Sequence, residues 1–228
     1  MQDQYSRTQL LLGAEAMEKL HNSRVAVFGI GGVGGYTVEA LARSGVGALD
    51  LIDDDKVCLT NLNRQIIATR KTVGKFKVDV AEERVHDIDP DIKVTTYKTF
   101  FGPETQDSFD FSQFDYVVDA IDTVTGKLAL VQNAHDAGTP IISCMGTGNK
   151  LDASAFEVGE EHLDHRIGHE DDAEDDHDGT GNDAQSEAPR GACHLCNTLH
   201  SVEILDDLLS HCSNTGPKAG EPGGKGPL

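Results

Sequence analysis

The chain contains the stretch Val25-Ala26-Val27-Phe28-Gly29-Ile30-Gly31-Gly32-Val33-Gly34 near its amino end, and this stretch decides the fold. Its four leading apolar residues predict a strand that runs directly into glycines. Apolar positions at helical spacing follow from Val33 to Arg43, and Gly45 lies beyond them as a stop signal. Glycines between a strand and a helix let backbone N–H groups approach a phosphate at the positive end of the helix. The stretch therefore predicts a nucleotide-binding turn, although a glycine turn without a nucleotide has the same local pattern.

The following hundred residues alternate between strand and helix patterns. Further strands are predicted at 49–52, 94–99, 116–118 and 141–144, and further helices at 75–87 and 124–137. Strands separated by helical segments need crossover connections, which place helices on both faces of the sheet. The sequence thus predicts an α/β fold with a doubly wound, mostly parallel Rossmann-type sheet.

Composition limits the class of protein. A chain of 228 residues suffices for one such domain and a short extension. No apolar run approaches the roughly 20 residues that cross a bilayer, and the N-terminus lacks a secretory pattern, so we expect a cytoplasmic protein without membrane association. Five irregularly spaced cysteines indicate reduced thiols. The net charge of −20 argues against a nucleic-acid partner, but about half of the excess lies in one acidic segment, which weakens that argument.

An acidic residue follows the second predicted strand. Asp53 lies roughly 20 residues beyond the glycines, where a carboxylate can accept hydrogen bonds from ribose hydroxyls. At this point a nicotinamide-dependent dehydrogenase and an ATP-binding enzyme both remain open.

The next polar motifs favour ATP. They are Asp53-Asp54-Asp55, Asn61-Leu62-Asn63-Arg64-Gln65, Gly74-Lys75-Phe76-Lys77 and Asp119-Ala120-Ile121-Asp122. An enzyme that cleaves ATP between the α and β phosphates must hold the triphosphate, neutralise the leaving pyrophosphate and place Mg²⁺. Arg64 and Lys77 are suitable cations, and Asp122 is a hard oxygen ligand for the metal. Taken singly, the cations could be solvated charges and Asp122 a helix N-cap.

In this order and at these spacings, the motifs resemble the ThiF/MoeB/ubiquitin-activating superfamily. Within it, the chain is most similar to the tRNA threonylcarbamoyladenosine dehydratase branch, over about residues 4 to 158. The branch is indicated by Ser6-Arg7-Thr8-Gln9 with Leu12-Gly13, Glu39-Ala40-Leu41-Ala42-Arg43-Ser44-Gly45, Asp119-Ala120-Ile121-Asp122-Thr123 and Ser143-Cys144-Met145-Gly146-Thr147-Gly148-Asn149-Lys150-Leu151-Asp152.

The resemblance implies an ATP-dependent cyclisation of threonylcarbamoyladenosine in tRNA, through an adenylated carboxylate. Asp122 would bind Mg²⁺ and take part in catalysis, together with Arg64, Lys77 and an Arg7 that reaches the γ-phosphate from the second subunit of a homodimer. A sulfur-relay protein is a further partner that the family suggests. The nucleotide would contact Gly29, Gly31, Gly32, Gly34, Asp53, Asp55, Asn61, Arg64, Gln65 and Lys77.

Two other functions stay open. The acceptor could be the C-terminus of a ubiquitin-like sulfur carrier protein, but relatives of that kind hold zinc with two Cys-x-x-Cys pairs and only Cys193-His194-Leu195-Cys196 is present here. That single pair makes a structural zinc site a weak hypothesis. The chain could also be a non-catalytic nucleotide-binding remnant. Cys144 is expected to be a buried structural thiol because its neighbours are apolar, and Cys58 to pack beside the Asn61 motif.

The chain departs from the family after Val158. Relatives continue into a basic and then apolar portion, whereas Gly159 to Pro189 holds twelve acidic residues and one Arg. We therefore divide the chain into an ATP-binding, adenylate-forming domain at 1–158 and an acidic, His-rich extension at 159–228, which is expected to be disordered. Our interpretation of this departure is a shifted reading frame, with a natural tail as the alternative.

Overall fold

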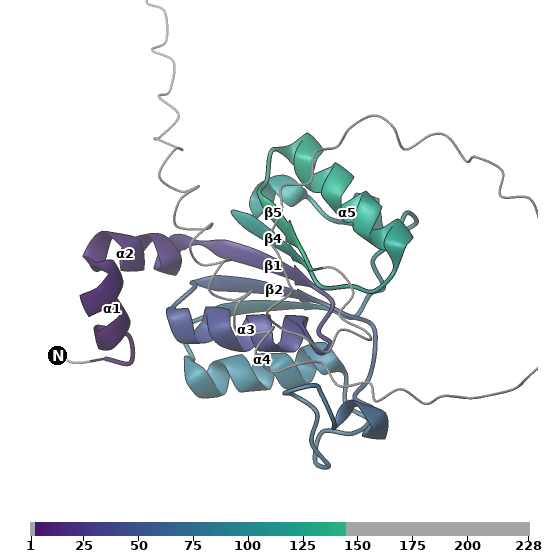
Figure 1. Ribbon diagram of the computed structural model, residues 1–228, viewed down its shortest axis with the longest axis horizontal. Helices are drawn as coiled ribbons and strands as arrows, with labels where there is room; N and C mark the ends of the chain where they lie inside the picture. The colour runs from purple at the N-terminus through teal and green to yellow at the C-terminus, as the bar shows by residue number, and fades with distance from the viewer. Residues whose placement is uncertain (1–2, 145–228) are drawn as a thin grey trace, which may run out of the picture.

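The computed structural model describes residues 3–144. Its centre is one sheet of five parallel strands in the order β3-β2-β1-β4-β5 (Figure 1). The strands are β1 (Arg24–Phe28), β2 (Ala48–Ile52), β3 (Lys93–Tyr97), β4 (Tyr116–Asp119) and β5 (Ile141–Ser143). All five lie where the sequence pattern predicts them, and the doubly wound α/β prediction is confirmed.

Helices cover both faces of the sheet. Figure 1 shows α3 (Gly34–Ser44) and α4 (Lys77–Ile88) on one face and α5 (Val124–Ala137) on the other. Successive strand side chains point to opposite faces, so β1 supplies Val25 and Val27 to one core cluster and Ala26 and Phe28 to the other. Burial on both faces explains why this strand is a continuous apolar run.

The second core cluster is aromatic. Between β3 and β4 the chain forms short 3₁₀ turns, η2 (Gln106–Ser108) and η3 (Phe111–Gln113), where a crossover helix would otherwise lie. Phenylalanines from this segment pack around Phe28, with ring centroids 4.9 Å from it for Phe101, 5.5 Å for Phe109 and 5.7 Å for Phe111. Aromatic packing thus closes the face that α5 covers only in part.

Two helices precede the sheet. The structure adds α1 (Ser6–Leu12) and α2 (Ala14–Asn22), which the sequence pattern did not predict. Tyr5 fixes their position because its hydroxyl donates to the Ala42 carbonyl at the end of α3 (3.2 Å) and contacts Asp89 after α4 (2.5 Å). Since α3 and α4 run antiparallel to the strands, both helices end at the amino edge of the sheet, and α1 lies there too (Figure 1).

The order of the strands reverses at β1. Its two neighbours, β2 and β4, are reached by crossovers that leave in opposite directions, and ligands of open α/β sheets bind at the carboxyl ends of strands beside such a point. Within residues 3–144, no helix combines the length and the apolar character that spanning a bilayer requires. The predicted boundary at Val158 and the acidic extension lie outside the described residues.

Candidate functional site

The glycine turn after β1 contains two kinds of glycine. Gly29 has φ +90° and a Cβ there would lie 2.6 Å from the carbonyl oxygen of Ala120, while a Cβ on Gly34 would overlap the carbonyl oxygen of Gly29. These two positions require glycine so that α3 and the residues after β4 can approach the turn. Gly31 and Gly32 differ, because among residues 3–144 the nearest atoms to a Cβ there belong to Gln65 at 3.9 Å and Arg64 at 3.7 Å. A methyl group would fit at both positions, so the packing of the described residues does not itself require glycine there.

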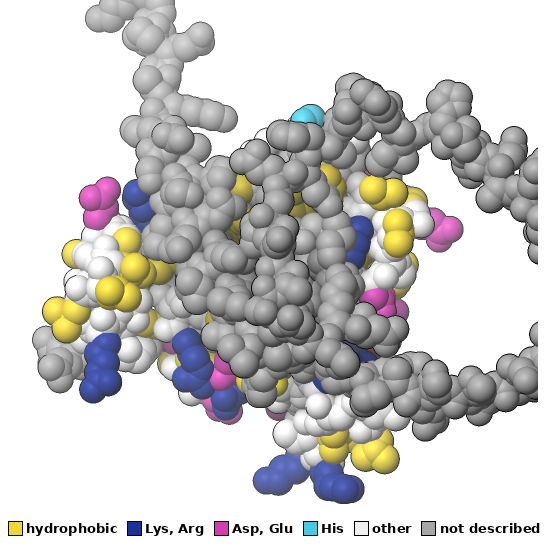
Figure 2. Space-filling view, in the orientation of Figure 1, with side chains coloured by type: hydrophobic (Ala, Val, Ile, Leu, Met, Phe, Trp, Pro, Cys, Tyr) yellow, Lys and Arg dark blue, Asp and Glu magenta, His cyan; other side chains and the backbone are white. Residues whose placement is uncertain are grey.

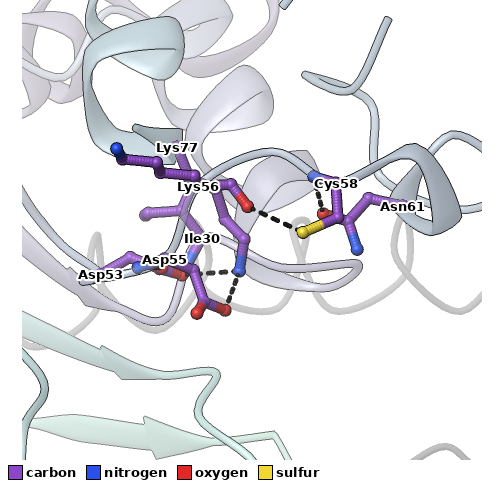
Figure 3. Close-up of polar contacts among 7 residues, drawn as sticks. All are labelled: Ile30, Asp53, Asp55, Lys56, Cys58, Asn61 and Lys77. Carbon is purple, nitrogen blue, oxygen red and sulfur yellow. Dashed lines mark hydrogen bonds and ion pairs between the residues drawn. The ribbon is translucent and has the colours of Figure 1, made fainter. Parts of the chain in front are cut away.

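An acid–base cluster lies beside this turn at the end of β2. The Asp53 carboxylate accepts hydrogen bonds from the backbone N–H groups of Ile30 (2.7 Å) and Asp55 (2.9 Å). The Lys77 ammonium lies 3.4 Å from Asp53 and 2.7 Å from the Asp55 carboxylate (Figure 3). Burial raises the pKa of Asp53, although Lys77 and the two N–H donors act in the opposite direction. The cluster therefore fixes the glycine turn to the first residue of α4.

The motif around Asn61 forms a compact turn rather than a long helix. Its 3₁₀ segment, η1 (Leu59–Asn61), is closed by the Asn61 side chain, whose oxygen accepts from the Cys58 N–H at 2.9 Å. Arg64 donates to the carbonyl of Thr60 (3.0 Å) and its aliphatic stem lies 3.7 Å from the position of a Cβ on Gly32. The turn therefore brings the aliphatic stem of Arg64 to the glycine loop, while its guanidinium group is bound to Thr60 and Asn63.

Gln65 is buried next to the same loop. Only 6% of its surface is exposed, and its Nε2 lies 3.9 Å from the position of a Cβ on Gly31. Within residues 3–144 its side-chain oxygen has no hydrogen-bond partner. A buried acceptor without a partner costs free energy, which a bound ligand or water that donates a hydrogen bond would recover.

A second buried ion pair lies at the end of β4, and the sequence analysis did not identify it. Asp119 is fully buried and both its oxygens lie 3.1 Å from the Lys127 ammonium. Lys127 also donates to the Cys144 carbonyl (2.8 Å), and the Ser143 hydroxyl donates to Asp119 (2.6 Å). Asp119 further accepts the backbone N–H of Ile121 at 3.2 Å. This network joins β4, β5 and α5 directly beneath the residues that lead to Asp122.

Asp122 is exposed at the carboxyl edge. It directly follows Ala120 and Ile121, whose backbone atoms pack against Gly29, so the chain reaches Asp122 from a segment that contacts the glycine turn. It is not the N-cap of α5; that position belongs to Thr123, whose side chain makes no capping hydrogen bond. Among the described residues, the acidic group with metal-ligand geometry is Asp53, Asp54 and Asp55, and Asp122 is not part of it.

Arg7 lies apart from these residues. It is exposed on α1, at the amino edge, whereas the glycine turn and its neighbours lie at the carboxyl edge of the same sheet. One subunit therefore does not bring Arg7 to the site. The buried state expected for Cys144 is confirmed, while Cys58 is exposed and contacts the Asn61 motif through its backbone. Cys193 and Cys196 lie outside the described residues.

Comparison with known proteins connects this geometry to a family. The ThiF family profile matches residues 5–211. The chain belongs to the ThiF family. It is 45% identical to the tRNA threonylcarbamoyladenosine dehydratase of Bacillus subtilis (strain 168) over 160 residues, which cover 70% of this chain and 63% of the relative. Identity to the protein of the same name from Escherichia coli (strain K12) is 39% over 154 residues, or 68% of this chain and 58% of the relative.

A solved ThiF-family structure has the same fold. The crystal structure of E. coli tRNA N6-threonylcarbamoyladenosine dehydratase, TcdA, in complex with ATP aligns with a TM-score of 0.65 and 39% identity. The alignment covers 66% of this chain and 62% of that one. The chain thus spans about three-fifths of the length of these relatives. The family predicted from the motifs is confirmed.

Proposed function

We propose that this chain is an ATP-dependent enzyme that adenylates the side-chain carboxylate of threonylcarbamoyladenosine in tRNA and so allows it to cyclise. The supporting observation is the convergence of the glycine turn, the Arg64 side chain and the Lys77–Asp53 pair at the reversal point of a parallel sheet. Similarity to dehydratases of this name, one of them solved with ATP, supports the same activity.

The chemistry requires activation because a free carboxylate is a poor electrophile. A carboxylate oxygen attacks the α-phosphorus of ATP, pyrophosphate leaves, and AMP leaves when the ring closes, for a net dehydration. Gly31 and Gly32 admit the phosphates, Arg64 and Lys77 neutralise the leaving pyrophosphate, and Asp53 accepts the ribose hydroxyls. Gly29 and Gly34 shape the turn, and the remaining contacts with the nucleotide come from Asp55, Asn61 and Gln65.

Asp122 is a better candidate ligand for Mg²⁺ than Asp53 or Asp55. Mg²⁺ usually keeps several waters and takes one or two carboxylates together with substrate phosphates, so a single exposed carboxylate such as Asp122 is enough. The oxygens of Asp53 and Asp55 already accept hydrogen bonds from Lys77 and backbone N–H groups, which leaves this acidic pair less suited to the ion. When bound, Mg²⁺ would screen the phosphate charge during the attack.

The proposed assembly is a cytoplasmic homodimer that acts on tRNA, with a sulfur-relay protein as a further candidate partner. Arg7 lies on a helix without a buried residue, and the neighbouring Leu10 and Leu11 are 89% and 84% exposed. A second copy that covers these leucines would bring Arg7 to the other subunit's triphosphate. Mixing inactive Arg7→Ala and Lys77→Ala subunits tests this: activity should return, because one mixed site is intact, and a mixture that stays inactive contradicts it.

ATP–pyrophosphate exchange distinguishes the acceptors. The assay is run on the full chain with threonylcarbamoyladenosine-modified tRNA, with a ubiquitin-like sulfur carrier protein, or without additive. Exchange that depends on the modified tRNA is expected. Exchange that depends only on the carrier protein would show that this protein, and not tRNA, is the acceptor. Absence of exchange in every arm would indicate a nucleotide-binding remnant.

A further inference from the structure

One stretch of this acidic chain is entirely free of acidic residues. From Lys56 to Lys77 there are six cations and no Asp or Glu, in a chain with a net charge of −20. The six are Lys56, Arg64, Arg70, Lys71, Lys75 and Lys77. Solubility does not require this clustering of cations, because the net charge of the chain already provides it.

Only part of this charge serves the nucleotide site. Lys77 is bound to Asp53 and Asp55, and Arg64 lies against the glycine turn. Arg70 and Lys71 are exposed, and neither has an ion pair with another residue of the described range 3–144. The proposed adenylation therefore leaves these two cations without a role.

The loop that carries Arg70 and Lys71 has a defined backbone. The Thr72 hydroxyl donates to the Ile67 carbonyl at 2.9 Å and accepts the Thr69 N–H at 2.8 Å. Ile67 is buried at the base of this turn. Figure 2 shows Lys and Arg side chains gathered on the loop that lies below α4 in Figure 1. The two cations are thus held at the tip of a folded loop.

The base of the loop also carries positive side chains. Two main-chain hydrogen bonds close this base, one from the Val57 N–H to the Lys75 carbonyl (2.9 Å) and one from the Gly74 N–H to the Val57 carbonyl (2.8 Å). Two ammonium groups lie over the Phe76 ring, Lys56 at 4.8 Å and Lys98 at 5.0 Å from its centroid. We define the basic loop surface as Lys56, Arg70, Lys71, Lys75 and Lys98.

We propose that the basic loop surface binds the phosphate backbone of the RNA that carries the substrate nucleoside. This inference rests on the proposed function, because it supplies the docking surface that the reaction needs. Unpaired cations on an exposed, ordered loop favour a polyanion, since each phosphate contact releases condensed counterions. Lys75 and Lys98 are paired with Glu83 and Asp79, so the binding should depend mainly on Arg70 and Lys71, which have no ion pair within the described part of the chain. Because phosphate contacts carry no sequence information, the modified base itself would be selected at the ATP site.

The test uses the full chain with Arg70→Ala and Lys71→Ala combined. The affinity for tRNA, measured by fluorescence anisotropy at several salt concentrations, should fall about tenfold or more near 0.1 M salt, and the slope of log K against log salt should decrease by about 2. The affinity for ATP should not change. The control combines Lys19→Ala and Lys93→Ala, which removes the same charge at the amino edge and should change tRNA affinity less than about twofold.

Each contrary result has a separate meaning. If the Arg70/Lys71 variant binds tRNA with the wild-type affinity and salt slope, the basic loop surface is not the RNA site, while the proposed function is untouched. If the control variant loses as much affinity as the loop variant, the effect is one of total charge and the inference is wrong. If the wild type binds no tRNA but exchanges pyrophosphate with a carrier protein, the proposed function fails, and the inference fails with it.

Discussion

Replacing Lys127 by Met should destabilise the domain strongly although Lys127 contacts no proposed substrate. The Lys127 side chain is only 12% exposed and donates to both oxygens of Asp119 and to the Cys144 carbonyl. Met keeps an unbranched apolar stem of similar size, so packing changes little. What is lost is the counter-charge of a fully buried carboxylate, which within residues 3–144 then keeps the hydrogen bonds from Ser143 and Ile121.

The expected size follows from that burial. Removing one partner of a buried ion pair costs about 3–5 kcal/mol, against about 0–1 kcal/mol for an exposed pair. For a chain of this length, that cost corresponds to a fall in Tm of about 10 °C. Thermal unfolding followed by circular dichroism measures it. Adding Asp119→Asn should restore part of the loss, because the remaining buried group is then neutral.

The result that would contradict this reasoning is specific. A Lys127→Met variant that loses less than about 1 kcal/mol would show that the Asp119 carboxylate does not depend on Lys127 as its counter-charge. Additive effects in the double variant would show that the two side chains do not interact in solution. The variant should lose activity even at temperatures where it remains folded, because the same network holds the chain segment that leads to Asp122.

The remaining predictions concern the turn, the metal and pH. Gly31→Ala should fold normally, since its Cβ makes only an ordinary contact with Gln65 at 3.9 Å, and it should lose ATP affinity because the methyl group takes room that a phosphate would occupy. Gly34→Ala should fail to fold properly because its Cβ overlaps the carbonyl oxygen of Gly29. Calorimetric ATP titration and a melting curve separate the two variants, and unchanged ATP affinity in Gly31→Ala would show that the phosphates do not bind at this turn. Asp122→Ala should abolish Mg²⁺-dependent turnover with Tm nearly unchanged, and a collapsed fold would mean a structural role. Burial and the hydrogen bond to Asp89 raise the pKa of Tyr5 to about 12. Tyr5 therefore contributes stability below pH 10 that is lost as pH rises toward 12, and urea melts should show a weaker loss in Tyr5→Phe.

Local pattern was sufficient for most of the fold. Each strand of the sheet and each covering helix is a run whose apolar pattern identifies it, and Gly45 and Gly138 mark the ends of α3 and α5. The first two helices were not predicted. α1 has no buried residue, and it is held through Tyr5, whose contacts with Ala42 and Asp89 lie 37 and 84 positions away in the chain and leave no periodic signal. α2 differs, because it buries Met17 and Leu20 at helical spacing, a local pattern that the sequence does carry.

The same distinction between local patterns and distant contacts applies to the candidate site. The glycine turn, Asp53 and Lys77 were predicted because each lies at the end of a recognisable element, and the sheet brings the ends of those elements together. Arg64 was predicted from its motif. Their roles at the nucleotide stay predictions. The Asp119–Lys127 pair was missed because it depends on how α5 packs across the sheet. Gln65 was named as a contact, but its buried, unpartnered oxygen is visible only once the loop is folded.

The basic loop surface shows why total charge was a weak guide to partners. Charges on a protein surface are screened beyond roughly 8–10 Å at physiological salt, so a phosphate near Arg70 responds to its immediate neighbours and not to the sum over 228 residues. Those neighbours in the chain, from Thr69 to Val73, include Lys71 and no acid. A net charge of −20 and a local site for a polyanion are therefore compatible. The same argument requires the site to weaken steeply with added salt, because its cations are exposed and unpaired within the described domain.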